Sequence, residues 1–351
     1  MNSKKNNITI YDIAKAAEVS PGTVSRYING VGTPREESRL RIEKAIQDFN
    51  YVPNRAARAL KSKKNNIICL AYPETDNPFF FNMVAAVETE TKRAGYSLMI
   101  YHTHGEISEE LHILSLMNEN IADGLFLINF NYSPEHFEAF NRVTCPLVIS
   151  SLCISPYGGN DTDNFDYVGI DVRTAEYLAT MHLINNGHKK IALIGGDKNI
   201  DVFKERYEGY CSALNKAGIP LRTDYCLFGK YDKQAGYEAG AKIAQMEDRP
   251  TAVCAVSDVM AIGAMRAFRE NSVVLPDEIA LVGMDNIDFT NDMSPRMSSI
   301  KMMQDEVGRC AVKIILDRIE GDVSPRKKII YQPELVVRES SSIIKSTSDT
   351  Q

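Results

Sequence analysis

The chain has 351 residues, of which 44% are hydrophobic and 25% charged, so it is long enough for two or three globular domains of soluble composition. No apolar run approaches the ~20 residues that cross a bilayer, and the N-terminus lacks the apolar core of a secretory signal, which argues against a membrane protein and predicts a cytoplasmic location. Residues 1–66 hold 13 basic and 6 acidic residues, whereas the whole chain has a net charge of −6, so a basic N-terminal segment precedes an acidic remainder.

Residues 9–29 have the pattern of two short helices joined by a tight turn. Thr9 with Asp12 three residues later predicts a capping box at the start of the first helix. Ser20 is a favourable N-cap, and Pro21 suits the first helical position because its missing N–H has no partner there. Apolar residues at helical spacing predict that the two helices pack together through Ile10, Ile13, Ala14, Ala17, Val24 and Ile28.

The outward face of the second helix would then carry Pro21, Gly22, Ser25, Arg26 and Asn29. A face of small polar residues with one arginine suits insertion into the major groove of DNA. An ordinary amphipathic helical hairpin fits the periodicity equally well. The basic charge of residues 1–66 favours DNA, because lysine and arginine release counterions from the phosphate backbone.

A third helix is predicted from Thr33, since Thr33, Pro34 and Glu36 repeat the arrangement of cap, first-position proline and capping box. Its apolar face would close a three-helix domain through Ile42, Ala45, Ile46 and Phe49.

Residues 54–60 follow Pro53 as a short run of helix formers with two arginines. A helix this short is marginal in water, so we expect it to form only against a partner. The alternative is a plain interdomain linker, continued by the polar, basic residues 61–66.

From residue 67 onward, strand and helix patterns alternate, which predicts parallel sheets with helices on both faces. The predicted strands are 67–72, 97–101, 124–130, 147–150, 168–170, 190–194, 226–228, 252–256 and 280–284. The predicted helices are 77–93, 109–119, 134–141, 173–185, 204–217, 235–246 and 259–270. The loop-like residues 155–166 divide the series into two doubly wound α/β lobes, and ligands of such sheets bind at the carboxyl ends of the strands, here between the lobes.

We find no motif that indicates catalysis: neither the phosphate-binding G-x-x-x-x-G-K-[ST], nor G-x-S-x-G, nor H-E-x-x-H occurs. We therefore predict no enzymatic activity, no cofactor and no metal site. The seven cysteines are odd in number and widely spaced, which favours reduced, buried thiols. His102 and His104 are interpreted as surface loop residues.

Several stretches together resemble the LacI/GalR family of bacterial transcription regulators. They are TIYDIAKAAEVSPGTVSRYIN, YVPNRAARAL, NPFF at 77–80, INNGHKKIALIGG at 184–196, ERYEGY at 205–210, LPDEIALVGMDN at 275–286 and PELVVRES at 333–340. The resemblance implies a helix-turn-helix domain over residues 1–52, a hinge helix and linker over 53–66, and a periplasmic-binding-protein-like domain over 67–345. Within that domain, lobe 1 would comprise about 67–165 and 295–325, and lobe 2 about 166–294 and 326–340.

The resemblance also implies a nucleoid-associated homodimer, or a tetramer, that binds a pseudo-palindromic operator. Pro21, Gly22 and Arg26 match positions that touch base edges. Positions that contact phosphates or orient the domain are matched by Thr9, Tyr11, Ser20, Thr23, Ser25 and Asn29. The DNA-binding positions of the hinge are matched by Asn54, Arg55, Ala57, Arg58 and Leu60. Leu60 matches a leucine that wedges into the minor groove and bends the DNA; the alternative is packing within its own subunit.

For the effector, the resemblance implies a sugar-like small molecule in the cleft between the lobes. Phe79 and Phe80 match residues that face it, whereas Phe81 is expected in the core. Arg206 and Asp285 match a pair that binds hydroxyl groups, with a structural salt bridge as the alternative. Further lining positions are Tyr231 and Ser257. The sequence departs from the family at Ser151, Leu152 and Val172, so the identity of the sugar does not carry over.

Together these observations predict a ligand-controlled repressor, in which the effector moves the lobes and thereby changes the spacing of the two hinges of a dimer. A cytoplasmic sugar-binding protein without a role at DNA is the main alternative, although the basic N-terminal segment argues against it. An enzyme that uses the cleft is a second alternative, for which no acid–base pair or nucleophile can be assembled.

Overall fold

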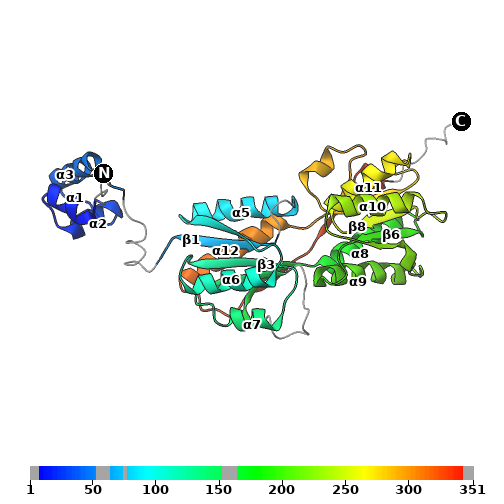
Figure 1. The fold of residues 1–351 in the computed structure, drawn as a ribbon, viewed down its shortest axis with the longest axis horizontal. Coiled ribbons are helices and arrows are strands. Elements are labelled where there is room, and N and C mark those ends of the chain that lie inside the picture. The colour runs from blue at the N-terminus through cyan, green and yellow to red at the C-terminus, as the bar shows by residue number, and fades with distance from the viewer. Residues whose placement is uncertain (1–7, 53–63, 74–76, 152–163, 343–351) are drawn as a thin grey trace, which may run out of the picture. The chain divides into compact units, whose positions relative to one another are not determined.

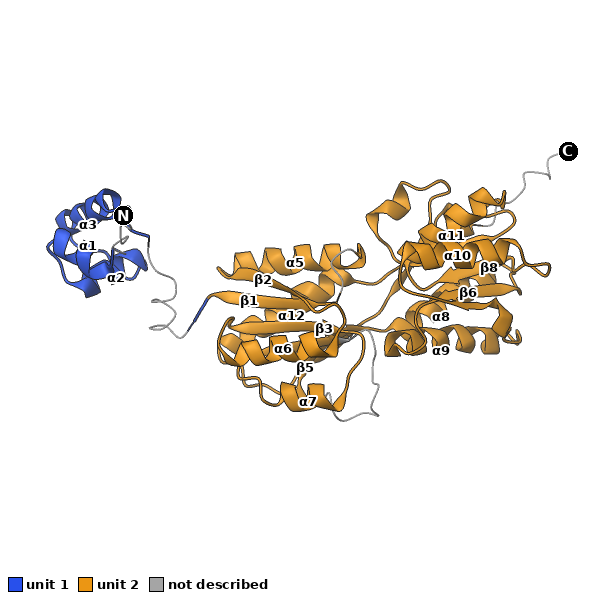
Figure 2. Ribbon diagram, viewed as in Figure 1, with its two compact units in different colours: residues 1–65 blue, residues 66–351 orange. Residues whose placement is uncertain are grey.

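The computed structural model describes residues 8–52, 64–73, 77–151 and 164–342 (Figure 1). The chain forms two compact units, residues 1–65 (unit 1) and residues 66–351 (unit 2), which are distinguished in Figure 2. None of the helices in the described ranges has the length and apolar character needed to span a bilayer. The predicted hinge residues Asn54, Arg55, Ala57, Arg58 and Leu60 lie outside the described residues, as do Leu152 and Cys153.

Unit 1 contains helices α1 (Ile10–Ala16), α2 (Pro21–Ile28) and α3 (Glu36–Asp48). The predicted capping box is confirmed: the backbone N–H of Thr9 donates to Asp12 Oδ2 at 2.8 Å, and that of Asp12 donates to Thr9 Oγ1 at 3.4 Å. Ser20 Oγ accepts from the backbone N–H of Thr23 at 3.1 Å, and Pro21 is the first helical residue, as predicted.

The core of unit 1 is formed by one apolar face from each helix. The side chains of Ile13, Val24 and Ile42 are completely buried. Two predictions about α3 are wrong. The backbone at Arg35 is extended, with φ −54° and ψ 145°, so the helix starts at Glu36 and Thr33 does not cap it. Phe49 occupies the C-cap position, where the apolar face of the helix ends, and is 43% exposed.

Unit 2 is built from two six-stranded sheets, each the centre of one lobe. In lobe 1 all neighbouring strands are parallel. Its order is β11 (Lys328–Tyr331), β5 (Asp166–Ile170), β4 (Leu147–Ser151), β3 (Gly124–Asn129), β1 (Ile67–Tyr72) and β2 (Ser97–His102). The lobe 2 order is β12 (Glu334–Val336), β10 (Ser298–Lys301), β9 (Ala280–Asp285), β8 (Ala252–Ala255), β6 (Ile191–Gly195) and β7 (Cys226–Phe228). In this second sheet the β10–β12 pair is antiparallel.

The helices cover both faces of each sheet, as predicted. Those of lobe 1 are α5 (Phe79–Arg93), α6 (Ile107–Asn118), α7 (Pro134–Phe140) and α12 (Gln304–Ile319). Those of lobe 2 are α8 (Val172–Asn185), α9 (Asp201–Lys216), α10 (Lys233–Ala244) and α11 (Asp258–Glu270). Figure 1 shows α10 and α11 on one face of the second sheet and α8 and α9 on the other. Short 3-10 helices lie at Thr223–Tyr225, Asp288–Asn291 and Glu339–Ser341.

The limits predicted for the lobes are wrong at three strands. β5 and β11 belong to lobe 1 and β10 to lobe 2, because Tyr167 pairs with both Ile149 and Lys328, whereas Ser298 pairs with Val282. The described chain therefore passes between the lobes after β5, after β10 and after β11.

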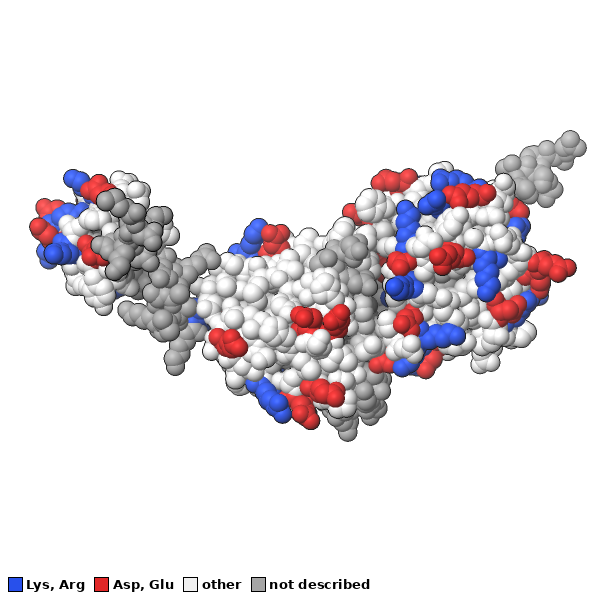
Figure 3. All heavy atoms as spheres, in the orientation of Figure 1, with Lys and Arg blue, Asp and Glu red and all other residues white. Residues whose placement is uncertain are grey.

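Most charged side chains lie on the surface, and Figure 3 shows basic and acidic residues next to one another over lobe 2. Pairs such as Arg249–Glu278 at 2.7 Å and Arg266–Glu270 at 2.8 Å are partly exposed. Exposed pairs of this kind contribute about 0–1 kcal/mol each, so they do not determine the fold.

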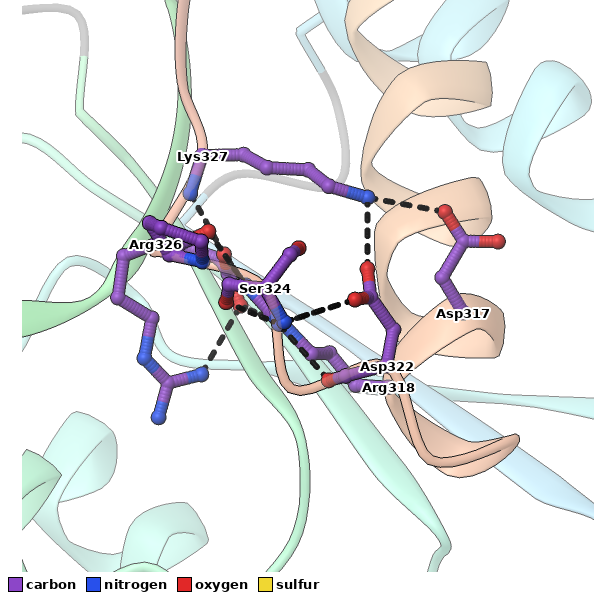
Figure 4. A network of polar contacts seen from close by, with 8 residues as sticks. Asp317, Arg318, Asp322, Ser324, Arg326 and Lys327 are labelled. Atoms are coloured by element: carbon purple, nitrogen blue, oxygen red, sulfur yellow. Dashed lines mark hydrogen bonds and ion pairs between the residues drawn. The ribbon is translucent and has the colours of Figure 1, made fainter.

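A buried ion pair of lobe 1 joins β5 to α12 and to the segment before β11. The guanidinium of Arg318 on α12 donates to both oxygens of Asp166 on β5, each at 2.8 Å. The backbone N–H of Lys327, just before β11, also donates to Asp166 at 2.8 Å. Figure 4 shows further ion pairs around Arg318, in which Lys327 Nζ contacts the carboxylates of Asp317 and Asp322. Burial raises the pKa of Asp166, but Arg318 and the other donors outweigh it and leave that pKa below its ordinary value.

Candidate functional site

The described residues that were predicted to touch DNA lie on or beside the exposed side of α1 and α2. Tyr11 is 71% exposed, and Gly22, Arg26 and Asn29 are exposed as well. Partial exposure is found at Pro21, Thr23 and Ser25. Arg26 Nε donates to the carbonyl of Gly22 one turn earlier at 3.3 Å. The hydroxyls of Thr9 and Ser20 cap the two helices, so these two residues also set the position of the exposed face.

A cavity in unit 2 lies between the carboxyl ends of the two sheets, where such folds bind ligands. It is lined by Asn77, Phe79, Phe80 and Phe130 of lobe 1 and by Ile200, Val202, Arg206, Tyr231, Ser257 and Asp285 of lobe 2. The structure thus brings all six residues predicted to bind an effector to one cavity.

The aromatic wall of the cavity begins at the start of α5. Asn77 Oδ1 accepts from the backbone N–H of Phe79 at 3.0 Å, which orients the first turn. The rings of Phe79 and Phe80 meet edge to face with 4.9 Å between centroids. Phe81 is 51% exposed, so its expected place in the core is wrong. A helix turns by about 100° per residue, which directs this third ring away from the cavity.

The opposite wall carries a buried arginine. Arg206 is 3% exposed, and its Nη1 donates to the carbonyl of Val256, the residue that follows β8. Its guanidinium carbon lies 5.8 Å from the ring centroid of Tyr231, within cation–π range. Arg206 Nε is buried and has no hydrogen-bond partner among the described residues. A buried donor without a partner is costly, so this wall favours a ligand with acceptor groups.

Asp285 is supported by a second buried carboxylate, Asp258. The backbone N–H of Asp258 donates to Asp285 Oδ2 at 3.3 Å. The Asp258 carboxylate accepts from Ser299 Oγ at 2.7 Å and from the backbone N–H of Ile287 at 2.9 Å. Burial, followed by the charge of Asp285, raises the pKa of Asp258 well above its ordinary value. Asp285 has φ +122°, a strained conformation of the kind that accumulates at binding sites.

Ser257 has two roles at the cavity. Its hydroxyl accepts from the backbone N–H of Met260 at 3.3 Å and so caps α11. The same residue lines the cavity, so the helix cap and the site are built together.

Two hydrogen bonds join the lobes beside the cavity. Asn131 Oδ1 of lobe 1 accepts from the backbone N–H of Asp201 of lobe 2 at 2.8 Å, and Gln304 Nε2 of lobe 1 donates to the carbonyl of Asp285 at 2.7 Å. The volume of the cavity is about 30 Å³. That volume admits one or two water molecules, so a larger ligand needs the lobes or the lining side chains to move.

Four lining residues were not predicted: Asn77, Phe130, Ile200 and Val202. Phe130 directly follows β3, and Ile200 and Val202 lie where α9 begins. The one feature of the sequence that could have indicated them is that they follow the carboxyl ends of predicted strands. This feature is less specific than a motif, because every loop at that edge of a sheet shares it.

Within the described ranges, no three His, Cys, Asp or Glu side chains form a group that could hold a metal ion. The described cysteines are all free thiols, and Cys69, Cys226 and Cys254 are buried. His104 is exposed, while His102 is half-buried at the end of β2 and its Nε2 lies 2.7 Å from the carbonyl of Pro73.

Comparison with protein-family models gives two matches. Residues 9–54 match the model of bacterial regulatory proteins of the lacI family, and residues 180–341 match that of a periplasmic binding protein-like domain. The HTH-type transcriptional repressor PurR of Actinobacillus pleuropneumoniae serotype 3 is 33% identical over 95% of this chain and 98% of its own. PurR of Aliivibrio salmonicida is 32% identical over the same shares of the two chains.

Solved structures agree with this fold. The transcriptional regulator CelR in complex with cellobiose has a TM-score of 0.71 and 26% identity, over 95% of this chain and 100% of its own. A Lac repressor dimer bound to operator and the anti-inducer ONPF has a TM-score of 0.84 over 96% of this chain and 99% of its own. At 22% identity, that second likeness concerns the fold alone.

Proposed function

This chain belongs to the LacI family of bacterial regulatory proteins, and we propose that it represses transcription as a dimer on a pseudo-palindromic operator, under the control of a sugar-like effector in the cavity of unit 2. Its relatives at 32–33% identity are transcriptional repressors, so it is a DNA-binding regulator and not an enzyme. The observation that carries the proposal is that Phe79, Phe80, Arg206, Tyr231, Ser257 and Asp285 line one and the same cavity.

The composition of the cavity supports a sugar-like effector. Aromatic rings such as Phe79 and Phe80 can pack on the apolar face of a sugar ring, while Arg206 and Asp285 can hydrogen-bond its hydroxyls. The CelR relative was solved with cellobiose.

A thermal-shift screen of the full chain with sugars, sugar phosphates and nucleobases tests the class of effector. Binding to the native state raises the melting temperature, by an amount that grows with ligand concentration over Kd. We expect a shift with a sugar or sugar phosphate. A shift with nucleobases and with no sugar would contradict this class.

The effector acts on DNA binding by changing how the lobes sit and thus the spacing of the two hinge segments in a dimer. The coupling between two such sites is typically about 1–3 kcal/mol. Filter binding to random duplex DNA across a salt series separates this function from that of a sugar-binding protein without a role at DNA. We expect retention that falls steeply with salt, since counterion release drives non-specific binding. No retention at any salt favours the sugar-binding alternative.

Replacing Leu60 with alanine is expected to weaken operator binding about tenfold or more, a loss of 1.4 kcal/mol or more. The reason is that a side chain wedged into the minor groove unstacks a base step and bends the DNA. The bend brings more of the protein surface into contact with the DNA, which offsets the cost of unstacking. The measurement is filter binding to an operator selected from random duplexes. The effector shift in the same variant should be unchanged, and equal operator affinity would exclude the wedge.

Replacing Arg26 with alanine is expected to weaken binding to the selected operator by about 1–3 kcal/mol and to relax its preference at one base pair. Arginine to guanine is the commonest specific contact in the major groove. Arg41→Ala is the matched control, because Arg41 is an exposed arginine of the same unit that lies on α3. Equal losses in the two variants would mean that Arg26 contributes charge and no base contact.

A further inference from the structure

Helix α9, which carries Arg206, begins without a capping side chain from its own N-cap residue. Ile200 occupies that position, with φ −89° and ψ 128°, and its side chain has no oxygen that could accept from the first turn. The first N–H groups of a helix have no acceptor inside the helix. The N–H of Asp201, the first residue of α9, therefore needs a partner from outside the helix.

The partner of this N–H comes from the other lobe. Asn131 lies in the loop between β3 and α7 of lobe 1, and its Oδ1 accepts from the backbone N–H of Asp201 at 2.8 Å. Both residues are partly buried. Their neighbours in the sequence, Phe130 and Val202, line the cavity. The hydrogen bond between the lobes therefore lies at the edge of the cavity.

Lobe 1 anchors the loop on both sides of Asn131. Before it, Asn129 Nδ2 donates to the backbone carbonyl of Asn131 at 2.9 Å. After it, the backbone N–H of Ser133 donates to His136 Nδ1 at 3.0 Å, and His136 Nε2 lies 2.7 Å from Glu110 Oε2 on α6. His136 and Glu110 are both buried, and a satisfied buried network of this kind makes its surroundings rigid. The amide of Asn131 is thus held in place before it meets α9.

We propose that Asn131 is a positioning residue of the cavity and acts as a helix cap between the lobes: closure of the lobes brings its amide oxygen onto the first turn of α9, and opening removes it. The start of the helix that bears Arg206 is then fixed only in the closed form. The proposal rests on the proposed function only in that the cavity is taken to bind the effector. Because the cavity of about 30 Å³ admits little more than water, the effector enters the open form, and the Asn131 bond stabilises the form that closes around it.

Hydrogen exchange of the Asp201 amide in the full chain tests the bond directly. Since an amide at the first position of a helix has no acceptor within the helix, protection there reports the oxygen of Asn131. In Asn131→Ala we expect this amide to exchange about two- to tenfold faster than in wild type, the usual contribution of one hydrogen bond. Asn131→Asp keeps an acceptor oxygen and should restore slow exchange. Asn118→Ala is the matched control, because Asn118 Oδ1 also accepts from a backbone N–H, that of Thr144, but within lobe 1.

The donor side of the bond offers a variant that leaves α9 itself intact. Asp201→Pro removes the N–H, while proline is favoured at the first position of a helix. The extended backbone of Ile200 also suits the residue before a proline. Asp201→Ala is the matched control, because both variants lose the ion pair of Asp201 with Lys204 and only the proline variant lacks the N–H.

The opening of the lobes is measured by the rate at which N-ethylmaleimide modifies a cysteine introduced by Ser257→Cys. Ser257 is 2% exposed and lines the cavity, which is too small for the reagent, so modification proceeds through the open form. Peptide mapping separates this site from the other cysteines of the chain. In this background we expect Asn131→Ala to react about two- to tenfold faster than Asn118→Ala, and Asp201→Pro to exceed Asp201→Ala by a similar factor.

Equal modification rates within either matched pair would overturn the proposal, and so would an Asp201 amide that exchanges in Asn131→Ala as it does in wild type. Faster exchange without faster modification would mean that Asn131 caps α9 and does not hold the lobes, which also overturns it. The exchange measurement needs no added cysteine and decides alone if Ser257→Cys does not fold. Neither measurement uses an effector or DNA, so a failure here leaves the proposed function standing, whereas the thermal-shift screen and filter binding can fail with this result intact.

Discussion

Replacing Arg206 with alanine is expected to abolish the response of operator binding to the effector, while operator binding itself persists. Arg206 is 3% exposed and lines the cavity, so the effector would lose hydrogen bonds to a buried cation. Hydrogen bonds to charged groups contribute about 1.5–3 kcal/mol each, so the loss of two weakens the effector roughly 100-fold or more. Operator binding persists because the predicted DNA contacts belong to residues 1–66, outside the sheets that form the cavity.

The measurement is filter binding to the selected operator with and without the compound identified by thermal shift. Arg206→Met is a useful companion, because it removes the charge and keeps an unbranched apolar side chain. Arg173→Ala is the matched control, since it removes an arginine of lobe 2 that is half-exposed and paired with Glu205. An unchanged response in both Arg206 variants would mean that the effector binds elsewhere.

Replacing Arg318 with alanine is expected to destabilise unit 2 by up to about 3–5 kcal/mol, the usual loss when one partner of a buried pair is removed, because the remaining ion-pair partner of Asp166 is Arg326, whose side chain is 49% exposed. Asp166 has a side chain that is 1% exposed, so its carboxylate would remain buried after losing two of its hydrogen bonds. Arg309→Ala, on the same helix, removes an exposed arginine that pairs with Asp305, and should change stability by about 1 kcal/mol or less. Urea unfolding monitored on unit 2 gives both values.

The same pair predicts a dependence on acid. Because the pKa of Asp166 is lower in the folded chain than its ordinary 3.8, the pair stabilises above that value and its contribution is lost as the pH falls through the folded pKa. Arg318→Ala should therefore flatten the acid limb of the stability profile. Equal free energies of unfolding for Arg318→Ala and Arg309→Ala would show that the buried Arg318–Asp166 pair stabilises unit 2 no more than an exposed pair does.

Elements with local signals were predictable from the sequence. Thr9 with Asp12, and Ser20 with Thr23, are contacts between residues three apart, so the start of α1 and α2 could be predicted without knowing the fold. The long strand and helix alternation after residue 67 likewise predicted the parallel sheets.

Features set by distant partners were not predictable. Asp166 pairs with Arg318, which lies 152 residues later in the chain, and β11 pairs with β5 across a similar separation. The limits of the lobes could therefore be assigned only once the pairing of the strands was known. The four-residue strands β10 and β11 carry too short a pattern to be recognised.

The site shows the same division. Six of its residues follow from the family resemblance. The orientation of the three consecutive phenylalanines was not predictable, because it depends on α5 starting at Phe79, which exposes Phe81. The complete burial of Glu176 on α8 was not predictable either, because a lone acid on a helix is normally solvated.

The interrupted order of the strands also decides when each part of the protein can be completed during translation. Unit 1 is complete once its 65 residues have emerged from the ribosome. Lobe 1 must wait: its strand β5 ends at Ile170 and its last strand begins at Lys328, with all of lobe 2 except β12 and the residues after it synthesised in between. At bacterial elongation rates that interval lasts on the order of ten to thirty seconds, during which the edge of β5 and the carboxylate of Asp166 await their partners in the nascent chain.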